Sequence, residues 1–164
     1  QLRNLATVGG SIYSRFGFSD VLTMFLGMDT WVELYDAGRI PLTEFVNMKK
    51  DNDILVNIIV RKEPLLTCYL SQRNIKTDFP VLTCAAAKTA GGFRVAIGAR
   101  PGKAVLYTLQ PNAAETPELT AARFAAEGRA GIRTESNMRG SAEYRNHLAG
   151  VLVKRAVLKL EGNR

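Results

Sequence analysis

The sequence predicts an α+β fold in two parts, residues 1–62 and 63–164. After residue 63, short apolar segments alternate with glycine and proline turns, which indicates an antiparallel meander. Two capped amphipathic segments follow, so we expect helices packed on that small sheet. The first part mixes strand patterns with one capped helix. Pro64, within residues 61–65, marks the boundary between the parts.

The first part opens with two adjacent glycines between β-forming residues. We expect a strand, a glycine turn and an irregular loop over residues 1–18. Without a Cβ, Gly9 and Gly10 can adopt positive φ and let a ligand approach the backbone. Successive N–H groups in such a turn can bind an anion. The hydroxyls of Thr7, Ser11 and Ser14 suit phosphate or polyol oxygens. The alternative from the pattern alone is an ordinary Gly-Gly turn.

The rest of the first part predicts one helix and a hairpin. Ser19 and Asp20 are typical of a helix start, and the helix should end near Gly27. On this pattern Asp20 completes a helix N-terminus. The elements expected next are a strand at 30–35, a turn at 36–38, a returning segment at 39–42, a short helix or turn at 43–45 and a buried strand at 56–60. Trp31 is either a stacking platform or a packing residue of its strand.

The second part predicts four strands and two helices. The strands are expected at 66–73, 81–87, 93–99 and 104–107. Thr116, Pro117 and Glu118 form a helix start, with a hydroxyl cap, a proline in the first turn and an acid beside it. The last helix opens at 139–141. Its expected apolar stripe is Tyr144, Leu148, Val151, Leu152 and Ala156, with Glu143, Arg145, Lys154 and Lys159 on the outer faces.

Composition narrows the class of protein. The 164 residues are 46% hydrophobic with a net charge of +7, and their basic residues are scattered rather than gathered in a stripe. We therefore expect no nucleic-acid partner. No long apolar run or leader pattern occurs, which favours a cytoplasmic protein without a membrane segment. With two cysteines and one histidine, a zinc site is not expected. Cys68 and Cys84 are typical of reduced core residues.

Two ordered motifs resemble one protein family. The segment from Arg3 to Ser11, followed by Ser19 and Asp20, resembles the R-N-x-A-T-I-G-G-N segment of the flavin-binding subunit of molybdenum hydroxylases. This is the family of the xanthine dehydrogenase and carbon monoxide dehydrogenase medium subunits. The segment from Arg139 to Ala156 resembles the family's R-G-S-x-x-Y-R…L-V-x-R-A motif. The resemblance covers essentially the whole chain, and it implies a partial FAD-binding sheet followed by a C-terminal domain.

The resemblance implies a role for ten residues. Thr7, Gly9, Gly10, Ser11 and Ser14 would hold the FAD phosphates and ribityl chain. Asp20 would accept hydrogen bonds from ribityl hydroxyls, and Ala6, Tyr13, Ser19 and Leu55 would line the pocket. Two positions depart from the family: Ser11 replaces the commoner Asn or Asp, and Leu70 stands where many members have a lysine near the flavin ring. The first departure weakens one hydrogen bond. The second removes a charge that would tune the flavin.

The resemblance also implies partners. Substrate would be hydroxylated at a molybdopterin centre in a large subunit, and electrons would pass through 2Fe–2S clusters in a small subunit. The flavin would then transfer them to NAD or another acceptor. No acid–base pair or activated nucleophile emerges in this chain, so no catalytic residue is expected; the cofactor carries the chemistry. The family's N-terminal lobe has no counterpart here and is an expected partner. The alternative is a non-catalytic assembly module that docks the other subunits.

Overall fold

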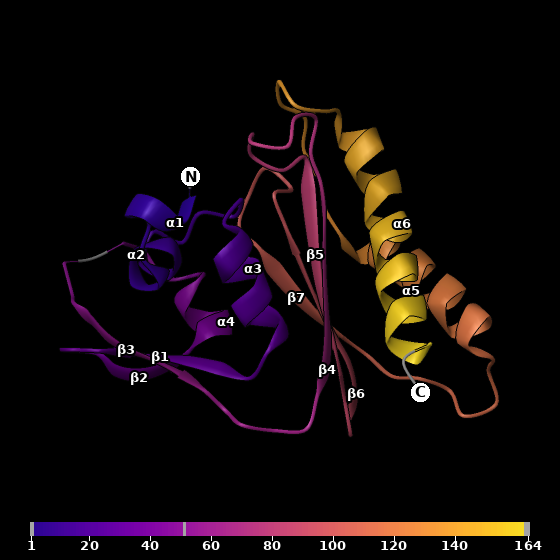
Figure 1. The fold of residues 1–164 in the computed structure, drawn as a ribbon, viewed down its shortest axis with the longest axis horizontal. Helices are drawn as coiled ribbons and strands as arrows, with labels where there is room; N and C mark the ends of the chain where they lie inside the picture. The colour runs from indigo at the N-terminus through magenta and orange to yellow at the C-terminus, as the bar shows by residue number, and fades with distance from the viewer. Residues whose placement is uncertain (1, 51, 163–164) are drawn as a thin grey trace.

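The computed structural model describes residues 2–50 and 52–162; Gln1, the first residue of the predicted N-terminal strand, lies outside them. Two antiparallel sheets are accompanied by helices, which confirms the α+β class. In Figure 1, the four-stranded sheet stands in the centre. Helices α5 and α6 cover one side of it, and the N-terminal elements lie on the other.

The N-terminal part contains four short helices and a three-stranded sheet. Its elements are α1 (Leu2–Leu5), α2 (Val8–Tyr13), α3 (Asp20–Gly27), β1 (Thr30–Leu34), β2 (Gly38–Pro41), α4 (Leu42–Phe45) and β3 (Leu55–Val60). The strand order is β2-β1-β3, and both pairs are antiparallel. The predicted hairpin and the helix after Ser19 are confirmed. The strand and the glycine turn expected within residues 1–18 are wrong, because α1 and α2 occupy residues 2–5 and 8–13, whereas the expected irregular loop is present over residues 14–18.

Strand β3 differs from the buried strand that its aliphatic residues predict. It forms one edge of the sheet, and Val56 is 52% exposed and Val60 38% exposed. The pairing with β1 shifts register next to Leu55, since Glu33 pairs with Asn57 while Leu34 pairs with Leu55. This irregularity takes Val56 out of the ladder. An edge position and a bulge therefore explain the exposure.

The C-terminal part is the expected meander. Its strands are β4 (Leu66–Gln72), β5 (Leu82–Thr89), β6 (Gly92–Gly98) and β7 (Val105–Leu109), and each pairs only with its neighbours in sequence. Helices α5 (Pro117–Gly131) and α6 (Ala142–Glu161) follow. Both predicted caps form: the Thr116 hydroxyl accepts from Leu119 N, and the Ser141 hydroxyl accepts from Tyr144 N.

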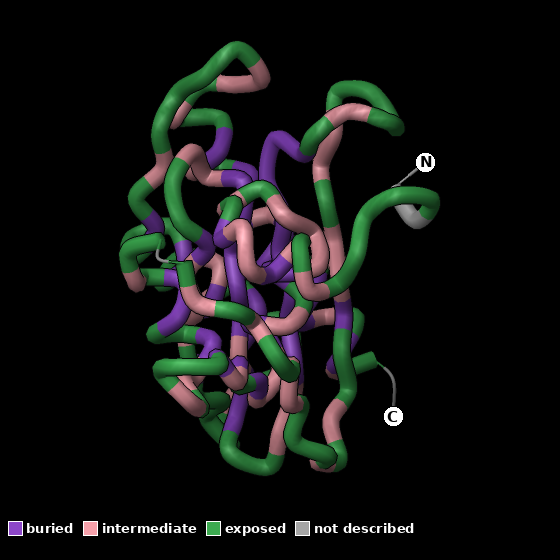
Figure 2. The backbone as a smooth tube through the Cα atoms, turned by 90° about the vertical axis from the view of Figure 1, so that its left-hand side faces the viewer, coloured by how far each residue is buried: buried purple, intermediate pink, exposed green. Residues whose placement is uncertain are grey.

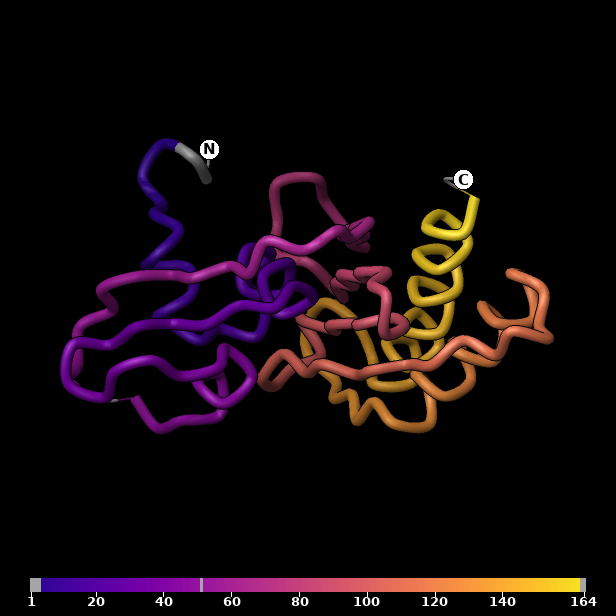
Figure 3. The backbone as a smooth tube through the Cα atoms, turned by 90° about the horizontal axis from the view of Figure 1, so that it is seen from below, coloured from indigo at the N-terminus to yellow at the C-terminus, as the bar shows by residue number. Residues whose placement is uncertain are grey.

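The central sheet is buried on both faces. Cys84 and Ala86 of β5 face the core under α5 and α6, whereas Ala85 faces the core under α3. These small side chains let α3 approach closely, since a Cβ on Gly27 would lie 3.4 Å from the Cβ of Ala85. Figure 2 shows the buried stretches gathered in the middle of the molecule, and Figure 3 shows the N-terminal part and α6 on opposite sides. Division of the chain at residue 62 stays a prediction.

Arg145 contradicts its predicted place on an outer face of the last helix. It is fully buried and donates to the carbonyls of Val81, Glu135 and Gly140 and to the Asn137 side chain. The loop before α6 folds over the guanidinium, and the guanidinium N–H groups satisfy carbonyls of that loop. Burial, followed by the charge of Arg139, lowers the pKa of Arg145. Tyr144, expected in the apolar stripe, is instead 44% exposed.

Candidate functional site

The paired glycines lie in a helix rather than in a turn. Thr7 is the N-cap of α2, and its Oγ1 accepts a hydrogen bond of 3.0 Å from Gly10 N. The described glycines with positive φ are Gly38, Gly92 and Gly102, so the predicted conformation of Gly9 and Gly10 is wrong. The cap provides the reason, because it fixes the first helical turn. A Cβ on Gly10 would lie 3.0 Å from Thr7 Oγ1 and would crowd the cap.

The predicted hydroxyl residues form one connected group. Ser11 Oγ donates to Thr7 O at 2.9 Å, and Ser14 Oγ donates to Ser11 O at 3.4 Å. Ser19 Oγ donates to the same Ser11 carbonyl at 3.0 Å and accepts from Leu22 N as the cap of α3. The N-terminal end of α3 is thus tied to Ser11 within α2. Each of these serine hydroxyls donates its hydrogen to a carbonyl of the chain, so its oxygen can still accept a hydrogen bond from a donor on a ligand.

The other residues that were predicted to line the pocket differ in their contacts and in their exposure. Leu55 is the nearest neighbour of Gly9, at 3.9 Å from the position of a Cβ there. Tyr13 OH donates to Asp53 O at 2.6 Å, so this side chain braces α2 against the chain before β3. Ala6 is exposed ahead of the cap. The surface is open, since Thr7 and Gly10 are exposed as well.

Asp20 is the first residue of α3 and is held by two side chains that the sequence reasoning missed. Arg73 Nη2 donates to both carboxylate oxygens, at 2.6 and 2.5 Å, and Tyr69 OH donates to Oδ1 at 2.5 Å. Burial and the adjacent carboxylate raise the pKa of Tyr69 far above its ordinary range, so the phenol stays protonated. A carboxylate has about four lone-pair positions, so Asp20 retains capacity for one further donor.

A second ion pair continues from this cluster. Arg73 Nη1 donates to Asp78 O at 2.6 Å, and Arg139 donates to both oxygens of the Asp78 carboxylate at 3.0 and 2.8 Å. The Arg139 hydrogen bonds, with one from Phe79 N, lower the pKa of Asp78. The charges therefore connect the start of α3 to the segment that opens α6. Both motifs that carry the family resemblance meet in this network.

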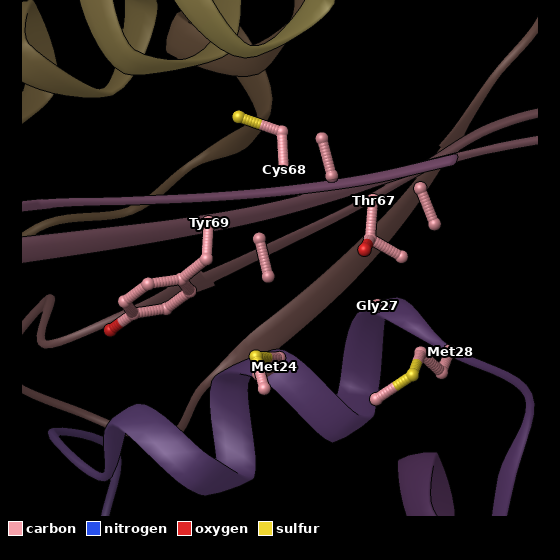
Figure 4. Close-up of a pocket in the computed structure, with 9 residues that line it drawn as sticks. Met24, Gly27, Met28, Thr67, Cys68 and Tyr69 are labelled. Atoms are coloured by element: carbon pink, nitrogen blue, oxygen red, sulfur yellow. The ribbon is translucent and has the colours of Figure 1, made fainter. Parts of the chain in front are cut away.

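Strand β4 presents its odd-numbered residues to α3. Figure 4 shows Tyr69 pointing toward α3 and Cys68 pointing toward the C-terminal helices. Leu70 packs with Cys68 in the core under α5 and α6. The position predicted to lack a lysine near the flavin therefore faces away from Asp20, and the cation beside Asp20 is Arg73. The alternation of the predicted strand was the signal that could have identified Tyr69 and Arg73.

An apolar crevice lies next to Tyr69. Met24, Gly27 and Met28 of α3 and its C-terminal end form one side, and the other side is β4 and β5 (Figure 4). Its volume is about 80 Å³. This space fits part of a ring system at most, so the crevice does not by itself hold a dinucleotide. Ser11 and Asp20 do not line this crevice.

The fold of this chain is highly similar to the folds of several solved chains. A carbon monoxide dehydrogenase chain from Hydrogenophaga pseudoflava matches with a TM-score of 0.84 and 21% identity, over 99% of this chain and 63% of that one. A chain of quinoline 2-oxidoreductase from Pseudomonas putida 86 has a TM-score of 0.79 and 21% identity, over 98% and 62%. Reconstituted CO dehydrogenase from Oligotropha carboxidovorans has a TM-score of 0.83 and 18% identity, over 100% and 64%.

The chain thus has the fold of chains found in molybdenum-containing dehydrogenases and oxidoreductases, as the resemblance of its motifs predicts. Among curated proteins it is 29% identical over 157 residues to YgfM of Escherichia coli K12, a protein described as uncharacterized, and equally to YgfM of strain O157:H7. No family model matches the sequence. The chain spans 57% of the YgfM length and less than two thirds of each solved chain.

Within residues 2–50 and 52–162, no helix has both the length and the apolar character needed to cross a bilayer. The same residues contain no group of three or more His, Cys, Asp or Glu side chains placed to hold a metal ion. Cys68 and Cys84 are free thiols in the core, as expected. Burial raises the pKa of both thiols.

Proposed function

We propose that this chain is part of the FAD-binding subunit of a molybdenum-containing hydroxylase or dehydrogenase. The observation that carries the proposal is that several side-chain hydroxyls and one carboxylate lie together on one open face. Thr7, Ser11, Ser14 and Ser19 are joined by hydrogen bonds, and Asp20 follows directly. The shared fold with carbon monoxide dehydrogenase chains supports it. Hydroxyl oxygens with free lone pairs and a carboxylate together suit the donating hydroxyls of a polyol chain.

In this proposal the ten predicted residues keep their roles. Thr7 Oγ1, which accepts from Gly10 N and keeps its hydrogen, donates to a phosphate oxygen, and the lone pairs of Ser11 and Ser14 accept from ribityl hydroxyls, with Gly9 and Gly10 leaving space beside them. Asp20 accepts a ribityl hydroxyl at its remaining lone pair, while Arg73 and Tyr69 fix the orientation of its carboxylate. The pocket is lined in this proposal by Ala6, Tyr13, Ser19 and Leu55. When bound, the flavin supplies electron transfer from iron–sulfur clusters to NAD or another acceptor.

The proposal requires other chains or domains. A molybdopterin-containing large subunit would hydroxylate the substrate, and a small subunit with 2Fe–2S clusters would deliver electrons. The face around Thr7 and Gly10 is exposed, so an N-terminal lobe that covers it would form the other wall of the flavin pocket. This lobe is proposed because the chain corresponds to less than two thirds of the carbon monoxide dehydrogenase chains.

A second candidate function is that of an assembly module without FAD. Its support is the state of Asp20, whose carboxylate already accepts from Arg73 and Tyr69. If those bonds satisfy Asp20 permanently, the chain would only dock the iron–sulfur and molybdenum subunits.

The deciding experiment is a visible absorbance spectrum of the purified chain after incubation with FAD and desalting. A retained flavin spectrum supports the first function. A chain that is folded by far-UV circular dichroism but retains no flavin contradicts it for this chain alone. Adding the N-terminal lobe then tests whether binding returns.

A further inference from the structure

A second cleft lies between the two sheets, away from the surface around Thr7 and Asp20. Its volume is about 230 Å³, and it is formed by the end of α3, the start of β1, the junction of β2 with α4, and side chains of β6 and β7. None of the ten residues predicted to bind FAD lines it. We call it the Trp31 cleft, after the aromatic residue on its wall.

Arg94 of β6 lines the Trp31 cleft with most of its hydrogen-bonding capacity unused. Its Nη2 donates to Glu63 Oε1, which is the one hydrogen bond that the described residues give its side chain. Its Nε is enclosed without an acceptor, whereas its Nη1 has no acceptor among the described residues and is not enclosed; the side chain as a whole is 18% exposed. A guanidinium carries five N–H donors. An open volume beside such a group is a place where a ligand acceptor gains a hydrogen bond.

The charges around the cleft balance in pairs. Glu63 offsets Arg94, and Arg61 Nη1 lies 3.6 Å from Oδ2 of Asp29, another residue of the cleft. A charged ligand therefore gains little net attraction. A neutral group with both a carbonyl and an N–H can instead accept from Arg94 and donate to the Asp29 carboxylate, which also lines the cleft.

The remaining walls fix the size and shape of the ligand. Trp31 is 40% exposed and offers an indole for stacking, and Leu26, Leu42 and Leu106 supply apolar contacts. The volume falls below the range typical of sites for drug-sized molecules, so it fits a single ring. We propose that the Trp31 cleft binds an uncharged, single-ring aromatic molecule that carries a carboxamide or lactam group.

The probe for this proposal is benzamide, followed by the fluorescence of Trp31, the sole tryptophan among the 164 residues. Benzamide should change the emission saturably. Aniline, which has no carbonyl, should bind about tenfold more weakly, and benzoate should bind no more tightly than benzamide. Arg94→Gln should weaken benzamide by about tenfold. Arg155→Gln, an exposed change on α6, should leave binding within about twofold.

Three results would overturn the proposal: no saturable change with benzamide, aniline equal to benzamide, or tighter binding of benzoate. An Arg94→Gln protein that folds and binds benzamide normally would do the same. If that variant fails to fold by circular dichroism, the probe series on the unaltered chain still decides. Because FAD retention is measured separately at a different surface, failure here is distinguishable from failure of the proposed flavin function.

Discussion

Replacing Asp20 by Asn tests the candidate flavin surface at its one carboxylate. The change keeps the shape but removes the charge that accepts from Arg73 and Tyr69. If a ribityl hydroxyl donates to Asp20, the loss of a charged acceptor costs about 1–2 kcal/mol of FAD binding, because Asn still offers one oxygen. That energy corresponds to a rise in the FAD dissociation constant of about 5- to 30-fold.

The same substitution also lowers stability. The Asp20 and Arg73 side chains are 30% and 23% exposed, so solvent screens their attraction in part. We expect a loss of about 1 kcal/mol in the free energy of unfolding. Arg73→Gln should lose a similar amount, and the double variant should lose little more than either single one. Urea unfolding followed by circular dichroism measures all three.

Binding is measured by flavin fluorescence on the form of the protein that retains FAD. Glu33→Gln serves as the matched control, because Glu33 pairs with Arg39 on the exposed face of the three-stranded sheet, outside the predicted flavin residues. An Asp20→Asn protein that binds FAD as tightly as the parent would refute the role assigned to Asp20. An equal loss in Glu33→Gln would show that any missing carboxylate has this effect.

Four further changes have defined outcomes. Gly10→Val should abolish flavin retention, because its Cβ crowds the Thr7 cap, while urea unfolding of the C-terminal sheet and helices stays unchanged. Thr7→Ala should destabilise α2 by about 1 kcal/mol through the lost cap, measured by thermal unfolding. Arg145→Met should lower the unfolding free energy by about 3 kcal/mol, because buried carbonyls lose their donor. Asp78→Asn should lower the melting temperature at neutral pH but not in strong acid. The lowered pKa of Asp78 means that its contribution with Arg139 is present above the ordinary pKa of about 3.9 and is lost as pH falls through the folded value.

Controls keep these outcomes interpretable. Gly91→Ala places a Cβ 3.9 Å from Thr89 Oγ1, an ordinary contact, so it should leave flavin retention intact. Arg145→Lys keeps the charge but loses the planar fork, and it should fall between the parent and Arg145→Met. If Arg145→Met is as stable as the parent, relief from burying the charge outweighs the lost hydrogen bonds. A melting-temperature difference for Asp78→Asn that persists below pH 2 would contradict the ion-pair explanation.

The meander and the helix starts could be predicted from sequence because local chemistry determines them. Thr116 with Pro117, and Ser141, are side chains whose hydroxyls satisfy free N–H groups at a helix start, and they do so here. The glycine pair was wrongly predicted to form a turn because Gly-Gly is common in turns. Its conformation is decided instead by the Thr7 cap and by packing near Leu55.

The polar partners at the candidate site required the tertiary fold. Arg73 is separated from Asp20 by 53 residues, and nothing local joins them. The resemblance placed Leu70 near the flavin ring, whereas the two-residue period of β4 places Leu70 in the opposite core. Arg145 was assigned to solvent because arginine is seldom fully buried. Its spacing from Leu148, Ala149 and Leu152 is that of one helix face, but the irregular loop whose carbonyls accept from its guanidinium has no sequence pattern.

The alanines of β5 have a consequence for how such proteins can be recombined. Ala85 faces the core under α3 and Ala86 faces the core under α5 and α6, so at this point of the sheet methyl side chains separate the two cores. A chimera that joined residues 1–62 of this chain to the C-terminal part of a relative would inherit a wall of another thickness wherever the relative has larger side chains. The two halves are therefore exchangeable only together with a matching β5.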